Sequence, residues 1–174
     1  LTLKISYRFD AENRLTQKIK QTPDGKAIKT LQYSYDPTTS VCRQVDIGSD
    51  GNVLKTHFYM FNQNGERIRK SSYNAAGKLL RNRIYLFDEQ EKRIRDYALS
   101  SDGTVLGSTA YIYNEDGFMT DIHYFDKSSQ LKGRSLIELD ESGRPVKKSR
   151  FDATGKLKSV MQYSYNAVPA VEKK

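Results

Sequence analysis

The sequence predicts an all-β protein, an antiparallel meander of about 13 strands built from β-hairpin repeats of 26 residues. Large apolar or aromatic residues recur every 26 residues without slippage, at Phe9, Tyr35, Phe61, Phe87, Tyr113, Leu139 and Tyr165. The next residue is always Asp or Asn, and a glycine (Ser129 in one copy) follows about half a repeat later. The same residue types recur at a constant spacing over six full copies and a half copy, which indicates a repeat architecture.

Each repeat contains two strands and two turns. The first strand, about nine residues long, ends at a pair such as Tyr59 and Phe61, and the second covers about eight residues, as in 66–73. The turns 62–65 and 74–77 begin with Asn and end with Gly, as type I turns prefer. We expect three-residue hairpin loops with a G1 bulge, in which these glycines have positive φ: Gly51, Gly65, Gly77, Gly103, Gly117, Gly143 and Gly155.

Such loops also predict how the strands pair. Phe61 would lie opposite Arg67, Tyr59 opposite Arg69, and Arg69 opposite Arg83. The pairing moves by two residues per repeat, and open sheets rarely exceed about ten strands without curling. We therefore expect a strongly coiled or rolled sheet, either open or barrel-like, as one domain over residues 1–166 followed by a tail at 167–174.

In this register all odd-numbered side chains share one face, and the even face is apolar in repeats three to five. An exposed apolar patch of that size calls for a cover, either the rolled sheet or a second copy of the chain. We expect Phe58, Ile84, Leu86 and Ile112 to be largely buried. The whole even set is Leu54, Phe58, Met60, Ile68, Leu80, Ile84, Leu86, Ile94, Leu106, Ala110, Ile112 and Ile122.

The odd face of the middle repeats combines arginine with tyrosine. Arginine offers forked donors, and tyrosine offers a stacking surface, so together they fit planar anions or bases. The alternative is cation–π packing on a solvated face. The candidate ligand-binding residues are Arg67, Arg69, Arg81, Arg83, Arg93, Arg95, Tyr59, Tyr85 and Tyr111.

Other kinds of site lack their motifs. Cys42 is the only cysteine, so the chain has neither an internal disulfide framework nor a thiolate zinc site. His57 and His123 lack metal-ligand spacing, and no calcium loop or phosphate-binding glycine loop occurs. Apolar runs are too short for a membrane-spanning helix. We expect a protein without enzyme activity, metal or cofactor.

The motifs Tyr33-Ser34-Tyr35-Asp36, Tyr111-Ile112-Tyr113-Asn114 and Asp140-Glu141-Ser142-Gly143-Arg144 resemble the YD repeats of the bacterial RHS family, with the pattern Tyr-x-Tyr-Asp-x-x-Gly-Arg. The resemblance covers residues 1–166. It implies an extracytoplasmic bacterial protein, of the cell envelope, periplasm or secreted, or a module that binds carbohydrate or a protein partner. The chain departs from the large RHS toxins because it lacks their conserved core segment and is too short for a toxin shell.

These observations favour a non-enzymatic binding or scaffold module. The net charge of +8 allows a polyanion binder that uses the Arg/Tyr face, but nucleic acid is less favoured because cations are spread along the chain and mixed with acids. A further alternative is an immunity-type protein that neutralises a toxin.

Overall fold

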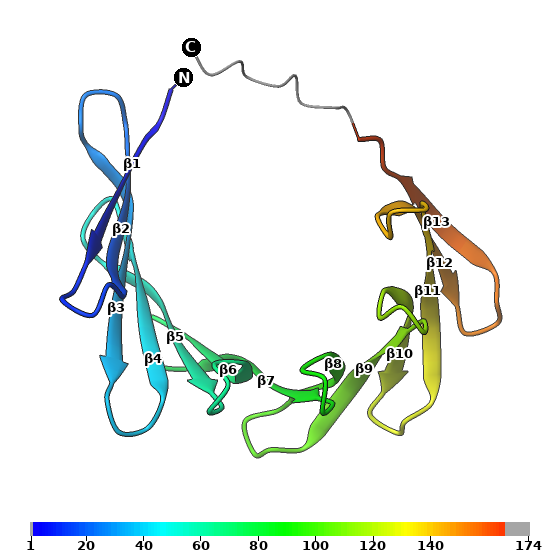
Figure 1. Cartoon of the computed structure of the whole chain (residues 1–174). Helices are drawn as coiled ribbons and strands as arrows, with labels where there is room; N and C mark the ends of the chain where they lie inside the picture. Colours follow the sequence, from blue (N-terminus) through cyan, green and yellow to red (C-terminus); the bar gives the residue numbers. More distant parts are fainter. Residues whose placement is uncertain (1, 166–174) are drawn as a thin grey trace, which may run out of the picture. The chain divides into compact units, whose positions relative to one another are not determined.

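The structure is a computed structural model that describes residues 2–165, and over that range the chain forms strands and turns but no helix. Figure 1 shows the strands in chain order, and their order in the sheet is the same, from β1 to β13. Since β1 and β13 end this order, the meander is open. The predicted all-β antiparallel fold is confirmed. The predicted tail at 167–174 lies outside the described residues.

The chain divides into two compact units, the first ending at Leu106 and the second beginning at Gly107. The first eight strands are β1 (Lys4–Phe9), β2 (Leu15–Gln21), β3 (Ala27–Asp36), β4 (Val41–Gly48), β5 (Val53–Phe61), β6 (Arg67–Asn74), β7 (Leu79–Phe87) and β8 (Arg93–Leu99). The remaining strands are β9 (Val105–Tyr113), β10 (Met119–Asp126), β11 (Leu131–Leu139), β12 (Pro145–Asp152) and β13 (Leu157–Gln162).

The turns have the predicted chemistry. All seven glycines named above have positive φ, between +76° and +89°. In the β5–β6 turn the Gly65 amide donates to the Asn62 carbonyl (3.1 Å), and the Asn62 side-chain Oδ1 accepts from the Glu66 amide (2.9 Å). Asn13, Glu91 and Ser129 occupy the equivalent left-handed position in other repeats, with φ between +59° and +62°.

Beside most turns, one strand contains an extra residue that was not expected from the sequence. Phe61 lies opposite Arg67 as predicted, but the next pair is Met60 with Arg69, so Ile68 is a β-bulge. Every strand pair resolved within the units has such a shift except β3–β4. The predicted pairing of Tyr59 with Arg69 is therefore wrong.

The offset between repeats nevertheless survives. Tyr59 lies opposite Lys70, and Lys70 lies opposite Arg83. Lys70 therefore takes the place between these two residues that was predicted for Arg69. From Tyr59 to Arg83 the chain advances 24 residues, two fewer than the 26-residue repeat. The predicted shift of two residues per repeat is confirmed for this part of the first unit.

Side chains of directly opposite residues point to the same side of a sheet. Before the bulge an odd-numbered residue lies opposite an odd-numbered one, as Phe61 does with Arg67, and beyond it an odd-numbered residue lies opposite an even-numbered one, as Tyr59 does with Lys70. We call face A the face of the first unit that carries Tyr33, Tyr59 and Tyr85, and face B the opposite face, which carries Phe58 and Ile84. The prediction that all odd residues share a face is wrong. In the second unit, for example, even-numbered Ile122 lies opposite Tyr111 and is buried.

Residues 2–165 do not cover the apolar patch. Phe58, Leu86 and Ile112 are 39%, 41% and 40% exposed, and Ile84 is half-buried, so their predicted burial by the sheet is wrong. The physical reason is that, within residues 2–165, each unit is a single layer without a second sheet or helix to pack on its apolar side. Burial of this patch by a second copy of the chain stays a prediction.

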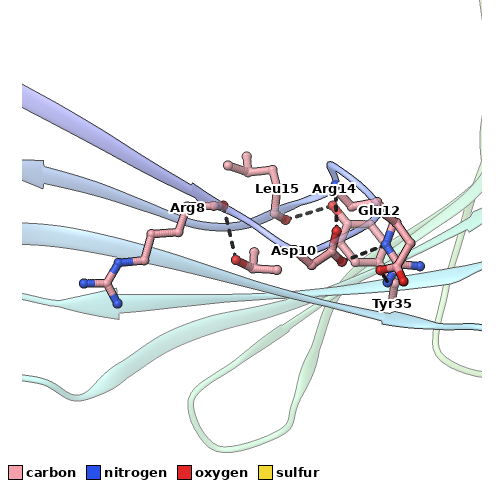
Figure 2. A network of polar contacts seen from close by, with 7 residues as sticks. Arg8, Asp10, Glu12, Arg14, Leu15 and Tyr35 are labelled. Carbon is pink, nitrogen blue, oxygen red and sulfur yellow. Dashed lines mark hydrogen bonds and ion pairs between the residues drawn. The ribbon is translucent and has the colours of Figure 1, made fainter.

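A polar clamp fixes the first hairpin to the following repeat (Figure 2). The Asp10 carboxylate accepts from the backbone amide and the Nε of Arg14, both at 2.8 Å. The Arg14 guanidinium lies 4.9 Å from the centre of the Tyr35 ring, and the Tyr35 hydroxyl donates to the Leu15 carbonyl (2.9 Å). The turn between β1 and β2 thereby contacts β3, the next strand of the sheet.

The same clamp recurs five repeats later, in the second unit. Asp140 accepts from the backbone amide and the Nε of Arg144 at 2.9 and 2.8 Å, and the Arg144 guanidinium lies 4.7 Å from the Tyr165 ring. The Tyr165 hydroxyl donates to the Pro145 carbonyl (2.8 Å). The Asp and Arg of the repeat pattern thus have a structural role in these two copies.

Gly65 and Glu91 occupy the same turn position in consecutive repeats, which provides a reciprocal test. Gly65→Ala should lower the free energy of unfolding by about 1 kcal/mol, because a Cβ disfavours a left-handed backbone. Glu91→Gly should raise it by about 0.5 kcal/mol, because relief of that strain exceeds the added entropy of the unfolded chain. Urea unfolding of the two variants measures both, and changes of the same sign would contradict the assignment.

Candidate functional site

The structure separates the nine candidate residues into three groups. Arg67, Arg81, Arg83 and Arg93 lie on face A with Tyr59 and Tyr85. Arg69 and Arg95 lie on face B, because the bulges at Ile68 and Ile94 stand between the two arginines of each strand. Tyr111 belongs to the second unit.

On face A, cations and tyrosine rings alternate from β5 to β8. The Arg67 guanidinium lies 5.6 Å from the centre of the Tyr59 ring and 5.1 Å from that of Tyr85. Arg93 lies 4.2 Å from the Tyr85 ring, and Lys70 lies 5.2 Å from the Tyr59 ring. Tyr85 is only 5% exposed, and two arginines lie near its ring. These contacts correspond to the cation–π packing alternative.

A single buried carboxylate balances two of the arginines. Asp96 is 1% exposed, and its Oδ2 accepts from Arg83 Nη1 at 2.6 Å and from Arg93 Nη2 at 2.7 Å. Its Oδ1 is also buried and accepts no hydrogen bond from the described residues. Charge-assisted hydrogen bonds of this kind are stronger than neutral ones, and the carboxylate holds both guanidinium groups in place.

Some cations on face A have no acidic partner within residues 2–165, in contrast to Lys29, Arg83 and Arg93. Lys55 and Arg81 are exposed, and neither forms an ion pair there. Burial lowers the pKa of Lys70, and the neighbouring charges of Arg67 and Arg81 lower it further. Asp46 opposes this effect, but among the described residues Lys70 keeps a pKa below its ordinary value.

The register also assembles a polar network that the sequence analysis missed. His57 Nδ1 lies 2.7 Å from Ser72 Oγ, and His57 Nε2 lies 3.8 Å from Asp46 Oδ1. Asp46 is buried and accepts from Lys29 Nζ at 2.8 Å and from Gln44 Nε2 at 2.6 Å. The correct bulge position was the missing signal, because it places His57 opposite Ser72.

These residue types occur in serine hydrolases, but the geometry here differs from a working triad. Ser72 is 5% exposed, which closes its hydroxyl to a substrate, and the Asp46 oxygen lies beyond hydrogen-bond distance from His57. The arrangement instead satisfies buried polar groups. Burial raises the pKa of Asp46, but the hydrogen bonds from Lys29 and Gln44 outweigh it and hold that pKa below its ordinary value.

No group of three or more His, Cys, Asp or Glu side chains in residues 2–165 could hold a metal ion. None of the described segments is a helix with the length and apolar character needed to cross a membrane. Cys42 is buried, and burial raises the pKa of its thiol.

No known protein family matches the chain, and no curated protein does. A porin-like protein from Bacteroides uniformis is 12% identical over 90% of this chain and 86% of that protein, with a TM-score of 0.40. The structure of TcdB2-TccC3 is 14% identical over 92% of this chain but 10% of that one, with a TM-score of 0.36. A protein of unknown function from Bacteroides fragilis is 7% identical over 93% of this chain and 92% of that protein, with a TM-score of 0.33. At these values no family is assigned, and the resemblance to YD repeats stays a prediction.

Removing the charge of Asp96 tests its role as a counterion. Asp96→Asn should lower the free energy of unfolding by about 2 kcal/mol, because two partly buried guanidinium groups lose their carboxylate. Arg83→Gln should cost less, because Arg93 still pairs with Asp96. Chemical denaturation measures both variants, and a larger loss for Arg83→Gln would refute the assignment.

His57 gives the fold a pH dependence. Burial lowers the pKa of His57 by more than the charge of Asp46 raises it, and the charges of Lys70, Lys55 and Lys29 lower it further. The imidazole of His57 therefore binds a proton more readily in the unfolded chain, where its pKa is about 6.5, than in the folded protein. The contribution of neutral His57 to the free energy of unfolding is complete above about pH 6.5. It is lost as the pH falls through the lower pKa of the folded state. Urea unfolding at pH 7 and pH 5.5 should show a smaller pH effect in His57→Gln than in the parent, and equal effects would speak against this origin.

Proposed function

We propose that this chain is a non-enzymatic binding module that holds an acidic polysaccharide on face A of its first unit. The observation that supports the proposal is an excess of cations over carboxylates on this face between β3 and β8. The cations are Lys29, Lys55, Arg67, Lys70, Arg81, Arg83 and Arg93, and the carboxylates are Asp46 and Asp96.

The distribution of this charge favours an extended ligand over a small ion. Strands lie about 4.8 Å apart, so the cations from β3 to β8 extend over roughly 24 Å along the sheet. A polymer with regularly spaced carboxylates can contact several of them at once. Surface electrostatic attraction of this kind weakens as salt increases.

The tyrosine contacts favour polysaccharide over nucleic acid. Binding of single strands without sequence preference uses aromatic rings on which bases stack. Arg67 and Arg93 already lie against the Tyr85 ring, and Lys70 lies near Tyr59. Sugar carboxylates need only the cations and their forked donors. A place outside the cytoplasm, as the resemblance to YD repeats implies, forms part of the proposal.

Matched double variants test the proposal, because β6 to β8 carry arginines on both faces. Arg67→Gln/Arg81→Gln removes two charges from face A, and Arg69→Gln/Arg95→Gln removes two from face B as the control. The parent should bind polygalacturonate in low salt, and the face A variant should bind at least about tenfold more weakly while the control changes little. Calorimetric titration with salt variation measures this.

Two results would contradict the proposal. One is a parent protein that does not bind polygalacturonate at low ionic strength. The other is an equal loss of binding in the two double variants, since binding would then depend on net charge and not on face A. Tighter binding of a single-stranded oligonucleotide than of polygalacturonate would support the nucleic-acid alternative instead.

A further inference from the structure

We propose a second, separate binding site on face B of the first unit, for a small polyol that carries one carboxylate or phosphate group. The site is a hollow of about 340 Å³ across β1 to β4. Its lining includes Arg8, Gln17, Gln32, Ser34, Arg43 and Val45.

The strand register assembles this hollow. Arg8 lies opposite Gln17, Gln17 opposite Gln32, and Gln32 opposite Val45, which makes one row of side chains across four strands. Val45 is buried and forms an apolar floor. Ser34 and Arg43 are a facing pair next to this row. Residues from four strands therefore contribute to one recess.

The charge of the hollow is uncompensated. No Asp or Glu lines it, and neither Arg8 nor Arg43 forms an ion pair with any residue in 2–165. Figure 2 shows the Arg8 guanidinium pointing away from the Asp10 carboxylate, which is held by Arg14. Exposed, unpaired guanidinium groups at a recess offer forked donors that match a carboxylate or phosphate.

The amide side chains define the rest of the ligand. Gln17 Oε1 is buried and accepts no hydrogen bond from the described residues, and such an acceptor calls for a donor. A hydroxyl group of the ligand would supply it. Gln32 and Ser34 add further donors and acceptors in the same recess. An oxyanion with neighbouring hydroxyl groups, such as a sugar acid or a sugar phosphate, meets both requirements.

The test compares glucuronate, glucose 6-phosphate, glucose and inorganic phosphate by calorimetric titration of the whole chain. We expect one or both sugar acids to bind, and glucose and inorganic phosphate to bind at least about tenfold more weakly. Preference for glucuronate or for glucose 6-phosphate tells a carboxylate ligand from a phosphate ligand. Equal binding of glucose, equal binding of inorganic phosphate, or no binding of either sugar acid would overturn the proposal.

Variants locate the binding. Arg8→Gln/Arg43→Gln should weaken sugar-acid binding at least about tenfold, and Gln17→Glu should do the same by giving Arg8 an internal carboxylate. The control is Arg67→Gln/Arg81→Gln, which alters face A and should leave this binding unchanged. Melting temperatures of all variants establish that they fold. Loss of binding in the face A control, or unchanged binding in both hollow variants, would overturn the site without affecting the proposal for face A.

Discussion

One extra residue beside most turns determines which side chains share a face of this protein. A residue such as Ile68 has no direct partner on the neighbouring strand, so the alternation of the strand restarts with the opposite sense. Arg67 then faces the tyrosines of face A, and Arg69 bonds to Asn82 on face B. Two arginines only two positions apart thus have unrelated surroundings.

Face A keeps its high density of positive charge because two buried carboxylates organise it. Asp46 accepts from Lys29 and Gln44, and Asp96 accepts from Arg83 and Arg93. Neither carboxylate neutralises the face, but each fixes long side chains in a single geometry. Tyrosine rings then separate the remaining cations, which reduces their mutual repulsion at the surface.

The repeat period, the turn glycines and the pairing of Phe61 with Arg67 were predictable because turn chemistry is local. The bulge was not, because Ile68 looks like an ordinary strand residue and its register depends on the neighbouring strand. That single error placed Arg69 with Tyr59 and hid the contact between His57 and Ser72. Arg67 and Arg93 were placed correctly because they precede the bulges, and the candidates of β5 and β7 were placed correctly because the shift of two residues per repeat survives.

The number of repeats, and not the identity of single residues, is the quantity that such a sheet can vary most freely. From Tyr59 to Arg83 the register advances by an even number of residues, so a whole 26-residue copy can be gained by tandem duplication without exchanging the two faces. An insertion of one residue within a strand would exchange them for the rest of that strand. A charged surface on such a protein can therefore lengthen by one repeat at a time during evolution, because each repeat contacts only its neighbours.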